Sequence, residues 1–246
     1  GGGEPLLDIS GLQCRRGVGA KAYRVELPRL MLRRGEVLAL TGASGSGKST
    51  LLEVLGLVAA PVSGARLTWL DTDGPIDLAA LWRCDAQRKL AWLRASGIGF
   101  VMQTGGLLPF LTVRENLGIN RRLLGLPEDG ADLRRLVDRL EIGSLLDAHP
   151  SRLSVGQQQR ASIGRALAHS PVLLLADEPT SALDPRLADR ALTLLLDLAG
   201  ELGTAVVIAT HEHERVHALG LRRLDARVLR ADDGAAASAR FEAAPA

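Results

Sequence analysis

The chain has 246 residues, of which 46% are hydrophobic and 24% charged, as in a globular protein with a sizeable core. The formal net charge of +2 excludes a polybasic arm or an acidic tail as the basis of function. No apolar run approaches the roughly 18 residues of a membrane-spanning helix, and the first residues lack the pattern of a secretion signal. We therefore expect a soluble cytoplasmic protein that reaches a membrane only through a partner.

The first half of the chain reads as strands around a glycine-rich loop. Strands are predicted over residues 6–13, 23–27 and 36–41, the last being a nearly continuous apolar run that is typical of a buried parallel strand. Glycines follow at 42–47, and residues 48–57 have helical spacing. Another strand is predicted over 64–70, a helix over 78–94 and a short strand over 98–102.

The second half alternates helices and strands. Residues 112–148 have helical periodicity, and a further helix is predicted over 156–168. An apolar strand over 172–176, a helix over 185–202 and a strand over 204–209 follow. This alternation predicts an α/β fold with a parallel sheet and an inserted helical lobe. The Ala-rich end, 231–246, is predicted to be a poorly ordered tail.

The glycine loop matches the pattern G-x-x-x-x-G-K-[ST] between a strand and a helix. Its glycines let backbone N–H groups converge on phosphate oxygens, and Lys48, one of only three lysines, supplies a charge for the β- and γ-phosphates. The Ser49 hydroxyl can ligate Mg²⁺. A flexible turn would explain the glycines but not Lys48, so we predict a nucleotide site made by Gly42, Ala43, Ser44, Gly45, Ser46, Gly47, Lys48, Ser49 and Thr50.

Two acids follow the apolar strand that ends at Ala176. In a parallel sheet the carboxyl ends of the strands meet at the ligand-binding edge, so Asp177 can serve Mg²⁺ and Glu178 can polarise the attacking water. Taken alone, the pair could equally be solvated acids before a turn. The phosphate loop decides in favour of a catalytic role.

A second possible anion site opens the helix at Ser154, where Val155, Gly156 and Gln157 follow. By default such a serine would be an ordinary helix cap. With these motifs in order, however, the chain resembles the ATP-binding subunits of ABC transporters, whose signature loop reads Leu-Ser-Gly-Gly-Gln. The resemblance runs over about residues 6–229 and extends to Asp184, in the loop that lines the dimer seam.

The resemblance implies a P-loop NTPase fold with a mostly parallel sheet, an N-terminal antiparallel β subdomain and an inserted helical subdomain. The catalytic core would take about 6–103 and 170–230, and the helical subdomain about 104–169. Gln103 would contact Mg²⁺ and the water, His211 the γ-phosphate, and Ser154, Gly156, Gln157 and Asp184 would complete the ATP site.

The implied activity is ATP hydrolysis by two copies of the chain, or this chain and a homologous ATPase, closed around two ATP molecules. Closure would drive a separate integral membrane permease, with the ATPase peripheral on the inner face of the cell membrane. Residues 98–116 are similar to the lipoprotein-release and macrolide-export ATPases, and the apolar cluster Leu107, Leu108, Phe110 and Leu111 would suit permease docking or a buried contact within the lobe.

Two features depart from the pattern. Val155 stands where the signature has its first glycine. The aromatic residue that usually stacks on adenine is replaced in register by Arg15 or Arg16, with Tyr23 further on in a position that favours core packing.

Two rival functions remain. A soluble ABC-type ATPase acting on nucleic acid or ribosomes would carry a coiled coil or a second cassette, and the scarce aromatics do not favour a stacking platform, so no nucleic acid is expected. A non-catalytic nucleotide switch would not need Glu178. The two cysteines, Cys14 and Cys84, fit neither a disulfide framework nor a metal cluster and are predicted to be buried.

Overall fold

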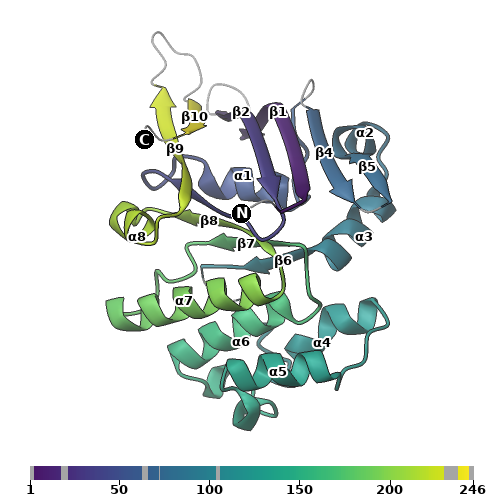
Figure 1. Cartoon of the computed structure of the whole chain (residues 1–246), viewed down its shortest axis with the longest axis vertical. Helices are drawn as coiled ribbons and strands as arrows, with labels where there is room; N and C mark the ends of the chain where they lie inside the picture. Colours follow the sequence, from purple (N-terminus) through teal and green to yellow (C-terminus); the bar gives the residue numbers. More distant parts are fainter. Residues whose placement is uncertain are drawn as a thin grey trace. The chain divides into compact units, whose positions relative to one another are not determined.

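The computed structural model describes residues 3–17, 22–62, 66–71, 73–103, 106–229 and 238–243 (Figure 1). The chain divides into two compact units, one of residues 1–92 and 207–246 and the other of residues 93–206. Helix α3 (Gln87–Gly97) and strand β8 (Ala205–Thr210) each carry the chain from one unit into the other.

The first unit is built on a mixed sheet. Its strands are β1 (Pro5–Arg16), β2 (Tyr23–Arg33), β3 (Val37–Thr41), β4 (Arg66–Asp71), β5 (Gly74–Asp77), β9 (Arg222–Leu229) and β10 (Ser238–Ala243). Their order is β5-β4-β1-β2-β10-β9-β3, followed by the part of β8 that belongs to this unit. The N-terminal strands pair antiparallel, whereas β3 pairs parallel with β9. The expected antiparallel β region at the N-terminus of an α/β fold is thus confirmed.

The core of the first unit follows from the alternation along its strands. In the ladder of β1 and β2, Leu12 is opposite Leu27 and Cys14 is opposite Val25, and all four side chains are buried. Since alternate residues of a strand point to the same face, this pattern seals one face of the ladder. The helices of the unit are α1 (Lys48–Leu55), α2 (Leu78–Arg83), the start of α3 and α8 (His213–Ala218).

The tail prediction is wrong for the six residues of β10. They form a strand between β2 and β9, and the side chains of Ala239 and Phe241 are fully buried. The period-2 alternation of these two residues was hidden in an Ala-rich composition. The rest of the predicted tail lies outside the described residues.

The second unit is mainly helical. Strands β6 (Ile98–Val101) and β7 (Leu173–Asp177) pair parallel, and the helices are α4 (Val113–Leu123), α5 (Ala131–Arg139), α6 (Val155–Leu167) and α7 (Pro185–Glu201), with short 3-10 turns η2 (Gly143–Leu145) and η3 (Pro150–Arg152). Helix α6 packs against α4, α7 and β6, and Figure 1 shows it next to α5.

A buried arginine ties these helices together. The Arg121 guanidinium, on α4, donates to the carbonyls of Pro127 at 2.7 Å and Ala168 at 2.6 Å, and to the Asp132 carboxylate at 2.7 Å. Only 1% of Arg121 is exposed. It therefore joins α4 to the start of α5 and the end of α6.

Two further expectations need correction. The helix predicted over 78–94 is two helices, α2 and α3, because the chain breaks at Asp85, which adopts a φ of 50°. Cys14 is buried as expected, but Cys84, at the end of α2, is exposed.

Asp77 is the N-cap of α2, and its carboxylate accepts the N–H of Ala80 at 2.9 Å.

Candidate functional site

The glycine loop lies in the first unit, between β3 and α1. Gly47, the residue before α1, has a φ of 91°, and a Cβ there would lie 2.3 Å from Cγ2 of Val25. Only glycine fits this position, because the left-handed backbone and the close approach to β2 both exclude a side chain. No side chain caps α1, so the first N–H groups of the helix point into the loop without a carbonyl of the helix to accept them.

Lys48 is held over this loop. Its ammonium donates to the carbonyls of Gly42 at 2.8 Å and Ala43 at 3.1 Å, and the side chain is buried. The Ser46 hydroxyl is also buried and has no hydrogen-bond partner among the described residues. The loop therefore gathers uncapped N–H groups, a cation and an unused hydroxyl, which is the composition of a phosphate site.

His211 belongs to the same unit. It follows Thr210, the last residue of β8, and β8 is the neighbour of β3 in the sheet. The Thr210 hydroxyl accepts the N–H of Glu212 at 3.1 Å, which fixes the turn that presents His211. The imidazole is exposed.

The structure separates the three candidates for the adenine contact. Arg16 is opposite Tyr23 in the ladder of β1 and β2, on the face that carries Val25, whereas Arg15 is opposite Arg24 on the other face. The ring edge of Tyr23 lies 3.2 Å from where a Cβ on Gly47 would be. Burial raises the pKa of the Tyr23 phenol, whose oxygen has no hydrogen-bond partner among the described atoms.

In the second unit, the acids emerge where β7 ends. Asp177 is the last residue of β7, and Glu178 has a φ of 44°, a left-handed conformation that is strained for any residue but glycine. The Ser181 N–H and hydroxyl both donate to the Glu178 carbonyl, at 3.2 and 3.1 Å. In the parallel pair, Val101 of β6 is opposite Ala176 of β7, so Gln103 leaves the sheet at the same edge as these acids.

The signature segment forms the start of α6. Ser154 is the N-cap, and its Oγ accepts the N–H of Gln157 at 3.3 Å while the Gln157 side chain accepts the Ser154 N–H at 2.9 Å. This capping box leaves the hydroxyl proton of Ser154 available for another acceptor. The N–H groups of Val155 and Gly156 lie in the first turn, where no carbonyl of the helix accepts them.

Asp184 is a cap as well. It precedes α7, and its carboxylate accepts the N–H groups of Arg186 at 3.1 Å and Leu187 at 3.2 Å. The loop between Glu178 and Asp184 is therefore anchored at both ends by hydrogen bonds to backbone groups.

The loop before α4 is shaped by Asn116, a residue whose role no sequence pattern indicates. The buried amide accepts the Leu108 N–H at 2.7 Å and donates to the carbonyls of Leu108, Leu111 and Thr112 at 3.1, 3.2 and 2.9 Å. With this loop fixed, Phe110 is 71% exposed. Leu107 is buried and Leu108 and Leu111 are half-buried, so Phe110 is the one member of the predicted cluster that is well exposed.

No cluster of three or more His, Cys, Asp or Glu side chains in the described ranges could hold a metal. A hydroxyl at Ser49 and a carboxylate at Asp177 are, however, the hard oxygen donors that Mg²⁺ takes when phosphates complete its shell. Within the described part of the chain, no helix combines the length and hydropathy needed to cross a membrane.

Comparisons with known proteins agree with this chemistry. A family model described as ABC transporter matches residues 27–181. The chain is 38% identical over 187 residues to the lipoprotein-releasing system ATP-binding protein LolD of Shewanella frigidimarina, covering 75% of this chain and 74% of that protein. It is 40% identical over 238 residues to the macrolide export ATP-binding/permease protein MacB 1 of Aeromonas hydrophila, covering 94% of this chain but 34% of that protein. The chain thus spans about a third of that relative's length.

Solved structures give the same answer. A dimeric structure of MJ0796, a bacterial ABC transporter cassette, superposes with a TM-score of 0.74 at 29% identity, covering 89% of this chain and 94% of that one. A second dimeric structure of MJ0796, in a post-hydrolysis state with ADP and Pi, gives the same score and covers 97% of this chain.

Proposed function

Because the chain belongs to the ABC transporter family, we propose that it is an ATP-hydrolysing subunit that drives a membrane permease. One observation carries most of this proposal, namely an uncapped helix N-terminus that follows a glycine loop and has the buried ammonium of Lys48 over it. A charge is costly to bury without an anionic or hydrogen-bonding partner. The hydrogen bonds from the Lys48 ammonium to the carbonyls of Gly42 and Ala43 hold this cation over the loop, where it can also contact a triphosphate.

The phosphate loop would bind the β- and γ-phosphates through its backbone N–H groups, Lys48 and the Ser46 hydroxyl. Mg²⁺ would be held by the Ser49 hydroxyl, by Asp177 and Gln103, and by phosphate oxygens, and would neutralise charge on the phosphates.

Hydrolysis requires a water oxygen to attack the γ-phosphorus, with loss of a proton and departure of ADP. The Glu178 carboxylate accepts that proton, and Gln103 and His211 orient the water and the γ-phosphate. The left-handed backbone of Glu178 sets the direction in which its side chain leaves the end of β7.

Each ATP would be shared by two copies. The hydroxyl of Ser154 and the first N–H groups of α6, including that of Gly156, would face the γ-phosphate bound to the partner's loop, with Gln157 holding Ser154 in place. Asp184 would keep the neighbouring loop in position at the seam. The dimeric MJ0796 cassettes support this arrangement.

Closure of the dimer would act on the permease through the loop that ends at Thr112, with exposed Phe110 as its contact. The names of the MacB and LolD relatives, macrolide export and lipoprotein release, support an export or release function. The subunit would then lie on the inner face of the cell membrane, attached through the permease. Nothing in these comparisons favours action on nucleic acid or ribosomes.

For adenine we propose the face of the ladder that carries Arg16 and Tyr23, in preference to Arg15. The Arg16 guanidinium lies 4.0 Å from the Glu53 carboxylate of α1, which keeps it on the side of the phosphate loop. A guanidinium can stack on an aromatic base.

The test is Glu178→Gln, which should bind ATP but lose about 100- to 10,000-fold of its turnover, because an amide cannot accept the proton. It should also accumulate as a dimer with ATP. Glu128→Gln, which alters a surface ion pair with Arg122, is the matched control. Steady-state phosphate release by Glu178→Gln at the rate of this control would refute the role of Glu178. Lys48→Ala should instead lose ATP affinity, measured by titration with a fluorescent nucleotide.

A further inference from the structure

A hollow of about 540 Å³ lies in the second unit beside the start of α6. One wall is the first turn of α6, at Ser154 to Gln157, and the other is Leu183 and the first half of α7. Both walls belong to one compact unit, and the proposed phosphate-binding hydroxyl of Ser154 stands at the edge of the hollow.

The surface of the hollow is apolar and open. Val155 is 55% exposed and Leu187 is 43% exposed. Between them, Gly156 places no side chain, since a Cβ on it would meet only Cδ1 of Leu187, at 3.9 Å. Leu194, seven residues after Leu187, lies on the same side of α7, and both Leu194 and Leu183, in the loop before α7, line the hollow. Single exposed apolar residues are ordinary, whereas a continuous group of them marks a contact surface.

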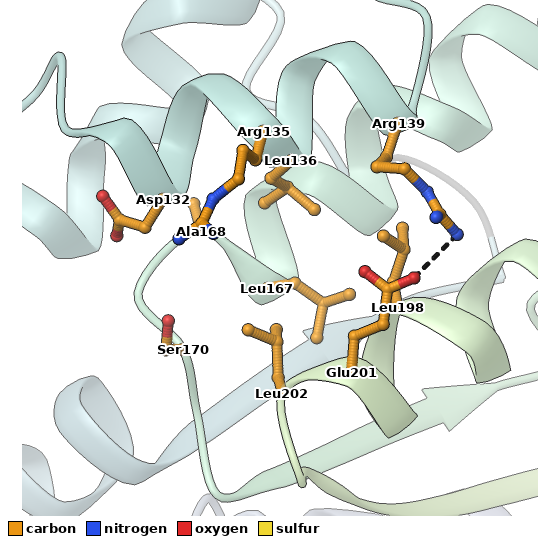
Figure 2. A pocket seen from close by; sticks show the side chains of 10 residues that line it. All are labelled: Asp132, Arg135, Leu136, Arg139, Leu167, Ala168, Ser170, Leu198, Glu201 and Leu202. Atoms are coloured by element: carbon orange, nitrogen blue, oxygen red, sulfur yellow. Dashed lines mark ion pairs between the residues drawn. The ribbon is translucent and has the colours of Figure 1, made fainter.

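The rim of the hollow is basic. The Arg160 guanidinium donates to the Glu141 carboxylate at 2.7 Å. The Arg139 guanidinium pairs with the Glu201 carboxylate at 2.8 Å, and Figure 2, a view of a neighbouring pocket, shows this ion pair as a dashed line. Arg190 also lines the hollow and adds a third guanidinium to this rim. An occupant with an apolar contact and negative charge suits this rim.

The geometry points to a second, ATP-loaded copy of this chain as the occupant, with Val155 and Leu187 as an apolar contact that stabilises the closed dimer. This inference rests on the proposed function. Any molecule that brings a phosphate to Ser154 and Gly156 must pass over Val155, which lies between them in sequence and projects into solvent. The nucleotide supplies the negative charge that the rim favours. The valine in the signature then strengthens closure where a glycine would add no side-chain contact.

The test is the dimer dissociation constant at saturating ATP in a Glu178→Gln background, measured by sedimentation. Val155→Thr keeps the shape of the side chain and replaces a methyl group with a hydroxyl. Loss of one apolar contact should weaken association about three- to fourfold. Because a two-fold symmetric dimer contains each contact twice, the dimer dissociation constant should rise about tenfold. Leu187→Asn should have a similar or larger effect.

The matched control is Val228→Thr, at a valine that is 51% exposed and lies outside the hollow. It should leave the dissociation constant unchanged, and all three variants should bind ATP as monomers with unchanged affinity. Equal dimer constants for Val155→Thr and Val228→Thr would overturn the inference while leaving the proposed function intact. Failure of the Glu178→Gln parent to dimerise with ATP would overturn the proposed function and the inference together.

Discussion

Replacing Asn116 with alanine should loosen the loop that we propose as the permease contact without touching the nucleotide site. The side chain is fully buried and makes four hydrogen bonds to the backbone of residues 108–112. Each such bond contributes about 0.5–1.5 kcal/mol, and the donor and acceptors that lose their partner keep a cost of burial. Because the loop is partly exposed, water can replace some of these bonds. We therefore expect a loss of about 2–3 kcal/mol.

For a chain of this length, that loss corresponds to a fall of about 4–12 °C in the unfolding midpoint. Calorimetry measures the midpoint, and hydrogen exchange of the Leu108 amide reports on the loop directly, since its N–H is bonded to Asn116 at 2.7 Å. Affinity for ATP should be unchanged, whereas stimulation of hydrolysis by the permease should fall.

Phe110→Ser is the matched comparison. Because Phe110 is 71% exposed, its loss should leave the unfolding midpoint unchanged while weakening the response to the permease. If Asn116→Ala unfolded at the parent temperature with Leu108 still protected from exchange, the reasoning about this loop would be refuted.

Two further predictions concern titrating groups. Burial raises the pKa of the Cys14 thiol to about 12, whereas Cys84 is exposed. An alkylating reagent at pH 8 should therefore label Cys84 alone in the folded protein and both cysteines after denaturation. Equal labelling of the two cysteines in the folded chain, measured by mass spectrometry, would contradict this. The side-chain hydrogen bond from Arg121 lowers the pKa of Asp132 below its ordinary value, so this group contributes stability above its unfolded pKa that is lost as the pH falls through the folded pKa. Asp132→Asn should therefore flatten the acid limb of the stability curve, and an unchanged limb in denaturant titrations between pH 7 and pH 3 would exclude this contribution.

Much of the fold could be predicted because the hydrophobic residues that form a regular pattern in the sequence are the residues that are buried in the structure. Strands β3 and β7 are buried on both faces, so their sequences are nearly continuous apolar runs, which are typical of buried parallel strands. The break at Asp85 was missed because a left-handed residue without glycine leaves no composition cue. Strand β10 was missed because burial of Ala239 and Phe241 depends on its position between β2 and β9.

The candidate site divides in the same way. The role of Lys48 could be predicted because the pattern G-x-x-x-x-G-K-[ST] places the lysine at a fixed sequence position relative to the glycines of the loop. The left-handed backbone of Glu178 depends on tertiary packing and could not be predicted from spacing. The apolar surface of Val155 and Leu187 joins residues 32 positions apart, so only the folded unit brings them into one hollow.

The most direct test of the account is hydrolysis by a mixture of two inactive variants, Lys48→Ala and Ser154→Arg. Lys48→Ala damages the phosphate loop, and Ser154→Arg puts a bulky cation where the hydroxyl should meet the partner's γ-phosphate. If each ATP is shared between chains, a mixed dimer has one site with both lesions and one site with neither. The account predicts that phosphate release, absent for each variant alone, returns in the mixture, whereas a mixture that forms dimers but stays inactive, under conditions where one intact site is known to turn over, would contradict it.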